Sequence, residues 1–348
     1  MGTITSRSSK YIGPLRDDAA LAARMEERQE RLMLRPAREN LGFATQAIWT
    51  DYQAIFGPDG YHARPHVELY TAGALPALID RNVEVSSFGY ARTDYPILSR
   101  PNGQRKYIYP MSRPEILATQ TTHYQRALGL DHALTNLTFL FPNIVNFRLL
   151  QARYPAAFAQ IVGCTRGGPS TPWCFTCGKC FLYAAYSLFT GAIDPRFDYD
   201  AAFTRSADAR RWTAYAESGV ELSVYGNAPW RSDLMYPVVY TVLCHIFANI
   251  DVGLLKGRIS NDAENNLHLF RALFGNHQFP NTHLLATEVA DFIGSPLIRR
   301  AQAIAAEHFP LVDRLPGPVL HGNELTIIDY QTRMPTPTAS VEHVARMP

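Results

Sequence analysis

Residues 163–180 read GCTRGGPSTPWCFTCGKC and hold four of the five cysteines of this 348-residue chain. Nine, two and two residues separate the four, which are Cys164, Cys174, Cys177 and Cys180. Zinc binds four thiolates at the corners of a tetrahedron, and a CxxC turn presents two thiolates to one ion. Two overlapping CxxC units and one more distant cysteine supply the full set. The stretch therefore predicts a closed zinc site with a structural role.

Other interpretations of the four cysteines stay open on spacing alone. They are four buried free thiols, a redox-active dithiol, and an iron–sulfur cluster. In the zinc interpretation, we expect Trp173 and Phe175 to shield the ion, and Arg166 and Lys179 to offset the negative charge of the thiolates. Cys244 lies alone in an apolar stretch and is expected to be a core residue.

The composition is that of an ordinary globular protein, with 47% hydrophobic and 18% charged residues. The 33 basic and 31 acidic residues nearly cancel, so we expect neither a nucleic-acid partner nor an anionic membrane partner. The apolar stretch 236–255 carries His245, Asn249 and Asp251, which are costly in lipid, and is expected to be a buried helix. The first residues lack an apolar core of the secretory type, which predicts a cytoplasmic protein. In that reducing compartment a cysteine cluster indicates a metal site or catalysis rather than disulfides.

Helix and strand patterns alternate on the N-terminal side of the cysteines. We expect strands over 66–71 and 83–89, and helices over 19–34, 43–56, 74–81, 112–128, 143–153 and 181–189. HGNELTIIDY, at 321–330, has the pattern of a strand with a turn.

This alternation predicts an α/β fold with a parallel-sheet, Rossmann-like layer, a four-cysteine zinc site and additional C-terminal helices. The expected divisions are an N-terminal helical segment (1–65), an α/β region with the zinc site (66–204), a mostly helical region (205–334) and a flexible tail (335–348).

The order of strand, helix, C-x9-C-x2-C-x2-C and apolar helix resembles the second half of the adenine nucleotide alpha hydrolase (PP-loop ATP pyrophosphatase) superfamily. The likeness extends to two groups in it, the epimerases of UDP-N-acetylmuramoyl-L-alanyl-L-glutamate and the 7-cyano-7-deazaguanine synthases. It rests on GCTRGG with CxxCxxC, on LYTAGALPAL, and on THYQRALGLDHALTNL followed by FRLLQARYP, and spans residues 66–200. The resemblance implies structural zinc, ATP with magnesium, and a biosynthetic enzyme that activates a carboxylate or amide by adenylation.

The chain departs from that superfamily in its phosphate-binding loop. The superfamily motif S-G-G-x-D-S uses glycines and a helix N-terminus to bring backbone N–H groups to the phosphates. The motif is absent here. SGVELS, at 218–223, keeps the outer serines and one glycine but follows the cysteines and runs into VYGNAPW. TAGAL, at 71–75, has the expected strand–turn–helix context, with one glycine and neither serine nor aspartate.

Candidate nucleotide-binding residues lie around the expected sheet. Ligands bind parallel sheets at the ends of strands and the loops that follow, which makes Thr71, Gly73, Ser86, Ser87 and Arg92 the candidates. Each of the nearby polar residues, taken singly, is expected to be a surface charge or a capping group. No catalytic-triad pattern surrounds the histidine among them. These residues are Asp94, Arg100, Arg105, Arg113, His123, Gln125 and Arg126.

Two functional hypotheses follow. The first is an ATP-pyrophosphatase-like enzyme acting on a small molecule, with a loop-bearing partner chain or a homo-oligomer completing the phosphate site. The second is a non-catalytic remnant of that fold, held together by zinc and used for binding or assembly. A zinc-ribbon nucleic-acid binder fits poorly, because the net charge is only +2 and the surroundings of the cysteines are not basic.

Overall fold

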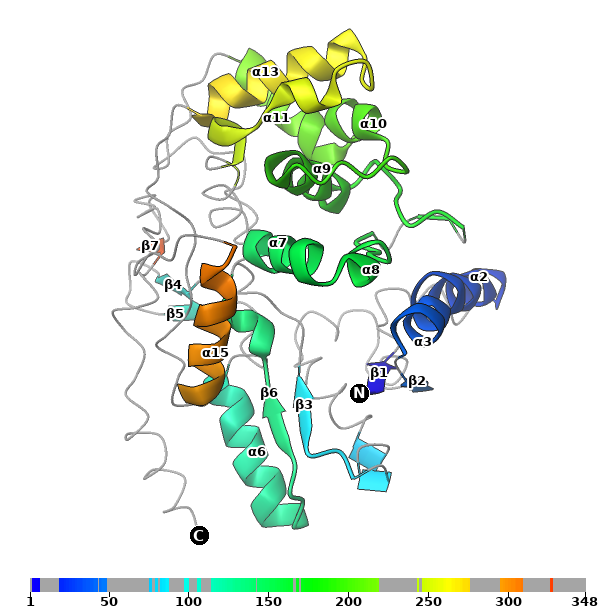
Figure 1. The fold of residues 1–348 in the computed structure, drawn as a ribbon, viewed down its shortest axis with the longest axis vertical. Coiled ribbons are helices and arrows are strands. Elements are labelled where there is room, and N and C mark those ends of the chain that lie inside the picture. The colour runs from blue at the N-terminus through cyan, green and yellow to red at the C-terminus, as the bar shows by residue number, and fades with distance from the viewer. Residues whose placement is uncertain are drawn as a thin grey trace.

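A computed structural model of the chain describes its mostly helical framework (Figure 1). The described residues are 2–6, 19–42, 44–48, 75–76, 79–80, 82–87, 97–99, 105–107, 114–141, 143–164, 167–168, 170–218, 243, 246–275, 295–308 and 326–327. Within these ranges, no helix has both the length and the apolar character that a membrane span requires.

Helices packed around α9 form the helical half of the molecule. α9 contacts α7 on one side and α10 and α11 on the other, and α13 packs against α10 and α11 (Figure 1). The elements are α7 (Asn143–Arg153), α8 (Pro155–Phe158), α9 (Gly178–Thr190), α10 (Tyr199–Thr204), α11 (Ala207–Glu217), the 3-10 helix η5 (Val252–Leu255) and α13 (Asn261–Gly275).

The core of this half surrounds α9. Its run FLYAAYSLF, at 181–189, is apolar on every side, as a helix enclosed by others must be, and eight residues of α9 are buried. Phe181 is inaccessible to solvent and contacts Phe203, Phe247 and Phe270 through their rings. Trp212 of α11 joins the same core through Phe274. The buried helix expected over 181–189 is confirmed.

A small parallel sheet lies on the other side of α7 from α9 (Figure 1). It consists of β3 (Val85–Ser87) and β6 (Ala133–Thr135), and α6 (Pro114–Leu128) packs against β6. Between β3 and β6 the chain passes through two short antiparallel strands, at 97–99 and 105–107, and then through α6, so a helix leads back to a parallel strand as in a βαβ unit. The helix expected over 112–128 is confirmed for 114–128, and the strand expected over 83–89 begins only at Val85. The described residues show this two-stranded parallel sheet rather than a full Rossmann-like layer.

The described part of the N-terminal region is one long helix between two paired strands. α2 (Ala19–Gln29) continues through the π-helical turn η1 (Glu30–Leu34) into α3 (Arg35–Leu41). β1 (Gly2–Ser6) pairs in parallel with β2 (Ala44–Ile48) over five residues. The helix expected over 43–56 is therefore wrong for 44–48. Pairing with a strand more than thirty residues away decides the conformation there, and a local pattern does not contain that partner.

The remaining elements are short. β4 (Ile97–Ser99) pairs antiparallel with β5 (Arg105–Tyr107) and with β7 (Thr326–Ile327), which falls inside the strand expected in 321–330. The 3-10 helix η4 (Leu137–Leu140) follows β6, and Arg153 at the end of α7 forms an ion pair with Glu307 just after α15 (Ser295–Ala306), with 2.7 Å between Nη1 and Oε2. In 236–255, the described residues 243 and 246–249 are helical. The strand expected over 66–71 and the tail 335–348 lie outside the described residues.

Candidate metal centre

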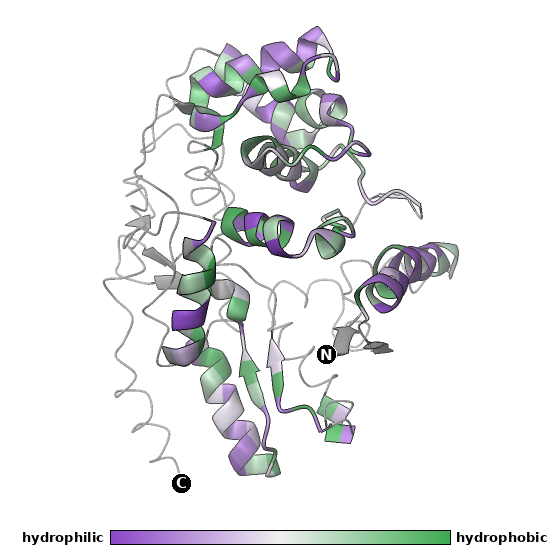
Figure 2. Ribbon diagram, in the orientation of Figure 1, coloured by the Kyte–Doolittle hydropathy of each residue, from purple (hydrophilic) through white to green (hydrophobic). Residues whose placement is uncertain are grey.

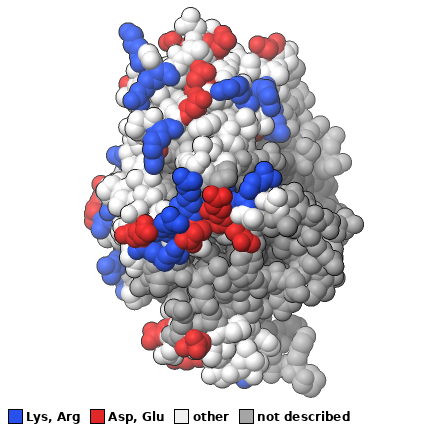
Figure 3. Space-filling model, turned by 90° about the vertical axis from the view of Figure 1, so that its right-hand side faces the viewer, with Lys and Arg blue, Asp and Glu red and all other residues white. Residues whose placement is uncertain are grey.

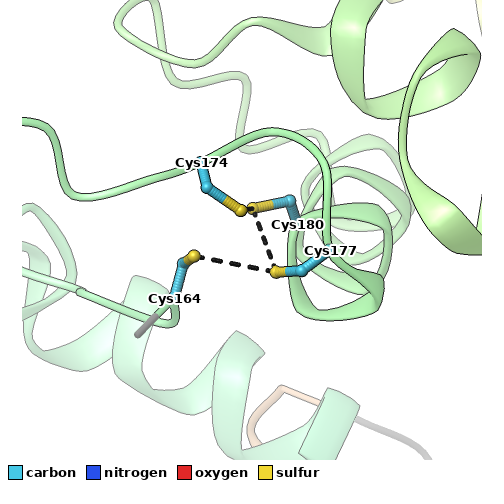
Figure 4. Close-up of side chains that lie close together, drawn as sticks. All are labelled: Cys164, Cys174, Cys177 and Cys180. Atoms are coloured by element: carbon cyan, nitrogen blue, oxygen red, sulfur yellow. Dashed lines mark hydrogen bonds between the residues drawn. The ribbon is translucent and has the colours of Figure 1, made fainter. Parts of the chain in front are cut away.

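The four cysteine sulfurs meet at one point (Figure 4). All four Sγ atoms lie within 4.8 Å of one another. The Sγ atom of Cys177 is 3.6 Å from that of Cys164 and 3.6 Å from that of Cys180, and the Cys174 and Cys180 sulfurs are 3.9 Å apart. Tetrahedral zinc, with bonds of about 2.3 Å to sulfur, separates its ligands by about 3.8 Å. These spacings match a four-thiolate zinc site.

The N-terminus of α9 positions two of the ligands. Cys177 is the N-cap residue of α9 and Cys180 lies in its first turn, where the Cys180 N–H donates to the carbonyl oxygen of Cys177 over 3.0 Å. Two side chains three residues apart in a helical turn lie on the same side of the helix. The partial positive charge of a helix N-terminus also favours thiolates.

The other two ligands come from the metal loop, defined as residues 159–177 between α8 and α9. Cys164 is buried and Cys174 is half-buried. Between Cys174 and Cys177, the backbone of Phe175 has a left-handed φ of 58°, a value that residues other than glycine rarely adopt. The Phe175 ring packs edge-on against Phe197, with 5.2 Å between centroids. Tertiary packing therefore holds the turn that brings these two cysteines together.

Neighbouring helices fix the metal loop further. Trp173 is buried, with its ring centroid 4.0 Å from that of Tyr183 on α9 and 5.3 Å from that of Phe197. The N–H of Ala207, at the start of α11, donates to the carbonyl oxygen of Thr176 over 2.9 Å. The loop is thus attached to α9 and α11 independently of any ion, which is the arrangement expected of a rigid structural site.

Hydrogen bonds join the thiols of the cluster. The hydrogen bond with Cys164 is the main cause that raises the pKa of Cys180 and of Cys177, and burial raises both further. Because metals bind thiolates, metal binding at these cysteines would release protons.

A buried cation contacts the metal loop from the N-terminal helix. Arg28, near the end of α2, is 6% exposed, and its Nη2 donates to the carbonyl oxygen of Cys164 over 2.8 Å. Of the two residues that the sequence suggested for offsetting thiolate charge, only Lys179 is among the described residues. Lys179 is exposed on α9, and Arg166 lies outside the described residues. No local signal indicates Arg28, because 136 positions separate it from Cys164.

The candidate nucleotide ligands are placed only in part. Ser86 and Ser87 end the short strand β3, in the sheet part of the molecule. The Ser87 Oγ accepts the N–H of Leu137 over 3.3 Å, so it already ties β3 to the segment after β6. Thr71, Gly73 and Arg92 lie outside the described residues.

The other polar candidates are also scattered. His123, Gln125 and Arg126 lie on α6 and are all exposed. Only the backbone of Arg105 is described, in β5, and the candidates Asp94, Arg100 and Arg113 lie outside the described residues. The described residues therefore assemble the cysteines into a site but do not assemble a nucleotide site.

No protein-family model, no curated protein and no solved structure matches this chain. The interpretation of the site therefore rests on the residues and their geometry.

Proposed function

We propose that Cys164, Cys174, Cys177 and Cys180 bind one zinc ion with a structural role. The observation that carries this proposal is the set of sulfur–sulfur distances, which fit a zinc tetrahedron. Four protein ligands close the coordination sphere, which favours stabilisation of the fold over catalysis at the metal.

Elemental analysis of the purified chain tests the metal. We expect one equivalent of zinc, with cobalt substitution giving the absorption of tetrahedral thiolate coordination. Detection of iron and acid-labile sulfide would instead indicate that the four cysteines bind an iron–sulfur cluster. Well under one equivalent of either metal would contradict the proposal.

At the level of the whole chain, we infer a PP-loop ATPase-like zinc protein that forms part of an ATP-dependent adenylating enzyme. The support is the order of the described elements. The parallel pair β3 and β6, connected through α6, is followed by the four-cysteine cluster and the buried helix α9, in the order of the resemblance described above. A larger parallel layer built onto this pair belongs to the same proposal.

The proposed chemistry is adenylation of a small-molecule carboxylate or amide. An oxygen of the substrate attacks the α-phosphorus of ATP, the bond to the β-phosphate oxygen breaks, and pyrophosphate leaves with its magnesium ion. The triphosphate needs N–H donors or cations to replace its water. Ser86, Ser87, Thr71, Gly73 and Arg92 are the candidate contacts in this chain. A partner chain, or a second copy, supplies the missing phosphate loop.

A second candidate is a non-catalytic module whose zinc site stabilises a binding or assembly surface. The observation that favours it is the hydrogen bond from Leu137 to Ser87, which gives this serine a role within the sheet. The zinc proposal is common to both candidates.

Calorimetric titration with magnesium ATP, together with a pyrophosphate-release assay, separates the two. For the enzyme with a partner, we expect weak binding and no release by the isolated chain, and turnover when a chain carrying S-G-G-x-D-S is added. Ser86→Ala should then lower turnover, whereas Thr119→Ala on α6, whose hydroxyl bonds within its own helix, should not. Binding at micromolar concentrations with release by the isolated chain would show that it holds a phosphate site of its own. No turnover with any loop-bearing partner would favour the non-catalytic module.

A further inference from the structure

Arg28 differs from the other arginines of its helix. The helix formed by α2, η1 and α3 is rich in hydrophilic residues (Figure 2). Acidic and basic side chains lie near one another on the face of the molecule that carries this helix (Figure 3). Arg24, Arg31 and Arg35 are exposed, but Arg28 is buried. The π-helical turn η1, a rare conformation often found at functional sites, begins two residues after Arg28.

The guanidinium of Arg28 is enclosed by the metal loop. Its Nη1 donates to the carbonyl oxygens of Gly168 and of Thr171, the latter over 2.5 Å. Its Nη2 donates to the carbonyl oxygens of Cys164, over 2.8 Å, and Pro172, over 3.2 Å. One side chain thus joins the backbone near the first cysteine to the backbone that leads into Trp173 and Cys174.

The sequence of the metal loop leaves space for this side chain. A Cβ atom on Gly167 would lie 2.9 Å from Nη2 of Arg28 and 2.4 Å from the carbonyl oxygen of Thr171. Both distances are too short for carbon, so any larger residue at 167 would displace the guanidinium or the loop. The close contact with Arg28 of the N-terminal helix therefore explains why a glycine stands at position 167.

Two electrostatic effects make the position of Arg28 favourable. A buried guanidinium is unfavourable unless its N–H groups are bonded, and here four carbonyl oxygens accept them. Four thiolates also outweigh the two charges of a zinc ion, so the site is anionic when loaded. A fixed positive charge bonded to the backbone of one ligand residue favours that loaded state.

We propose that Arg28 is a positioning residue for the metal centre, and that docking of the N-terminal helix and retention of the metal stabilise each other. The proposal rests on the zinc site proposed above. By linkage, if the seated Arg28 strengthens metal binding, the bound metal strengthens the docking of α2 by the same factor.

The test compares Arg28→Lys and Arg28→Ala with Arg24→Ala, an exposed arginine of the same helix. The rate at which a chelator removes zinc from the full chain is measured for each. Because partners of ligand residues contribute about 10- to 100-fold to metal affinity, we expect Arg28→Ala to lose zinc faster by about that factor. Lysine keeps the charge but cannot reach four acceptors, so Arg28→Lys should fall between Arg28→Ala and wild type. Arg24→Ala should behave as wild type.

Hydrogen exchange gives a second readout that does not depend on the variants. We expect backbone amides of residues 19–42 to exchange faster after zinc is removed from the wild-type protein, together with those of the metal loop. Unchanged exchange in 19–42 on metal removal, or equal zinc loss from Arg28→Ala and wild type, would overturn the coupling while leaving the zinc site intact. Absence of metal from the wild-type protein would instead overturn the proposed zinc site.

Discussion

The helical half and the sheet part of this molecule bury their side chains very differently. Around α9 the core is continuous and rich in aromatic residues, and Phe181, Phe247 and Phe270 are inaccessible to solvent. In the unit of β3, α6 and β6, by contrast, the described buried apolar side chains are Leu117 and Leu134. Val85, the first residue of β3, is 57% exposed.

This difference teaches where the chain can hold a site rigidly. Apolar burial supplies most of the stability of a fold, and regions with few buried contacts open at low free energy. The cysteines lie on the well-packed half, with α9 itself carrying two of them. The candidate nucleotide-binding residues Ser86 and Ser87 lie in the sheet part, where fewer of the described side chains are buried. Four predictions test the contrast, from the largest expected effect to the smallest.

The largest effect is expected at the metal centre. Cys180→Ser removes a solvent-inaccessible cysteine of the proposed zinc site from the first turn of α9. Structural zinc contributes an apparent binding free energy of about 10–16 kcal/mol in small zinc domains, and this energy stabilises the fold. We expect the variant to lose its zinc and to be largely insoluble. Thr176→Ser, which keeps the neighbouring hydroxyl, should express and bind zinc normally. A soluble, cooperatively folding Cys180→Ser protein would show that the aromatic core is sufficient.

The second prediction compares the two cores directly. Phe181→Ala removes a fully buried ring from α9 and should lower the free energy of unfolding by about 3–5 kcal/mol. Val85→Ala removes a mostly exposed side chain from β3 and should change it by no more than about 0.5 kcal/mol. Urea unfolding followed by circular dichroism measures both. Similar losses from the two variants would contradict the contrast.

The third prediction concerns a buried carboxylate in the helical half. Burial alone would raise the pKa of Asp194, but hydrogen bonds from Arg196 outweigh it and hold this pKa below its ordinary value of 3.8. Arg196 donates to Asp194 from its backbone N–H over 2.9 Å and from its Nη2 over 2.7 Å. Ionised Asp194 therefore stabilises the fold above pH 3.8, and this stabilisation is lost as the pH falls further.

Asp194→Asn tests this pH dependence. We expect the variant to be less stable than wild type by about 1–3 kcal/mol at pH 7, with the difference shrinking as the pH falls below 3.8. Urea midpoints of both proteins from pH 7 to pH 3 measure it. Loss of metal in acid affects both proteins, so the difference isolates the carboxylate. A difference that stays constant down to pH 3 would show that ionisation of Asp194 is not its source.

The smallest effect is expected in the sheet part. Ser87→Ala removes the hydroxyl that accepts the Leu137 N–H over 3.3 Å, a long bond at an exposed position. We expect a loss below about 1 kcal/mol in the free energy of unfolding. A loss as large as that of Phe181→Ala would mean that the sheet part is as tightly packed as the helical half.

The features that could be predicted from the sequence, namely the cysteine cluster and several helices, depend on patterns within short stretches of the chain. The four cysteines lie within a span of 17 residues, from Cys164 to Cys180, so their spacing alone predicted one cluster, and the structure brings the four sulfurs together. The apolar run from Phe181 onward predicted a buried helix because its own residues leave no polar face. Helices α6 and α7 followed from their periodic patterns in the same way.

Only the tertiary structure decided features that depend on distant partners. Ala44–Ile48 reads as helical by itself but forms a strand because β1 lies beside it. The buried cation at the metal loop is Arg28 rather than Lys179, because a helix 136 positions away packs its side chain against the backbone of Cys164. The conformation of Phe175 likewise depends on Phe197, more than twenty positions further along the chain. Local preferences amount to about 1 kcal/mol or less per residue, and contacts that close long loops can outweigh them.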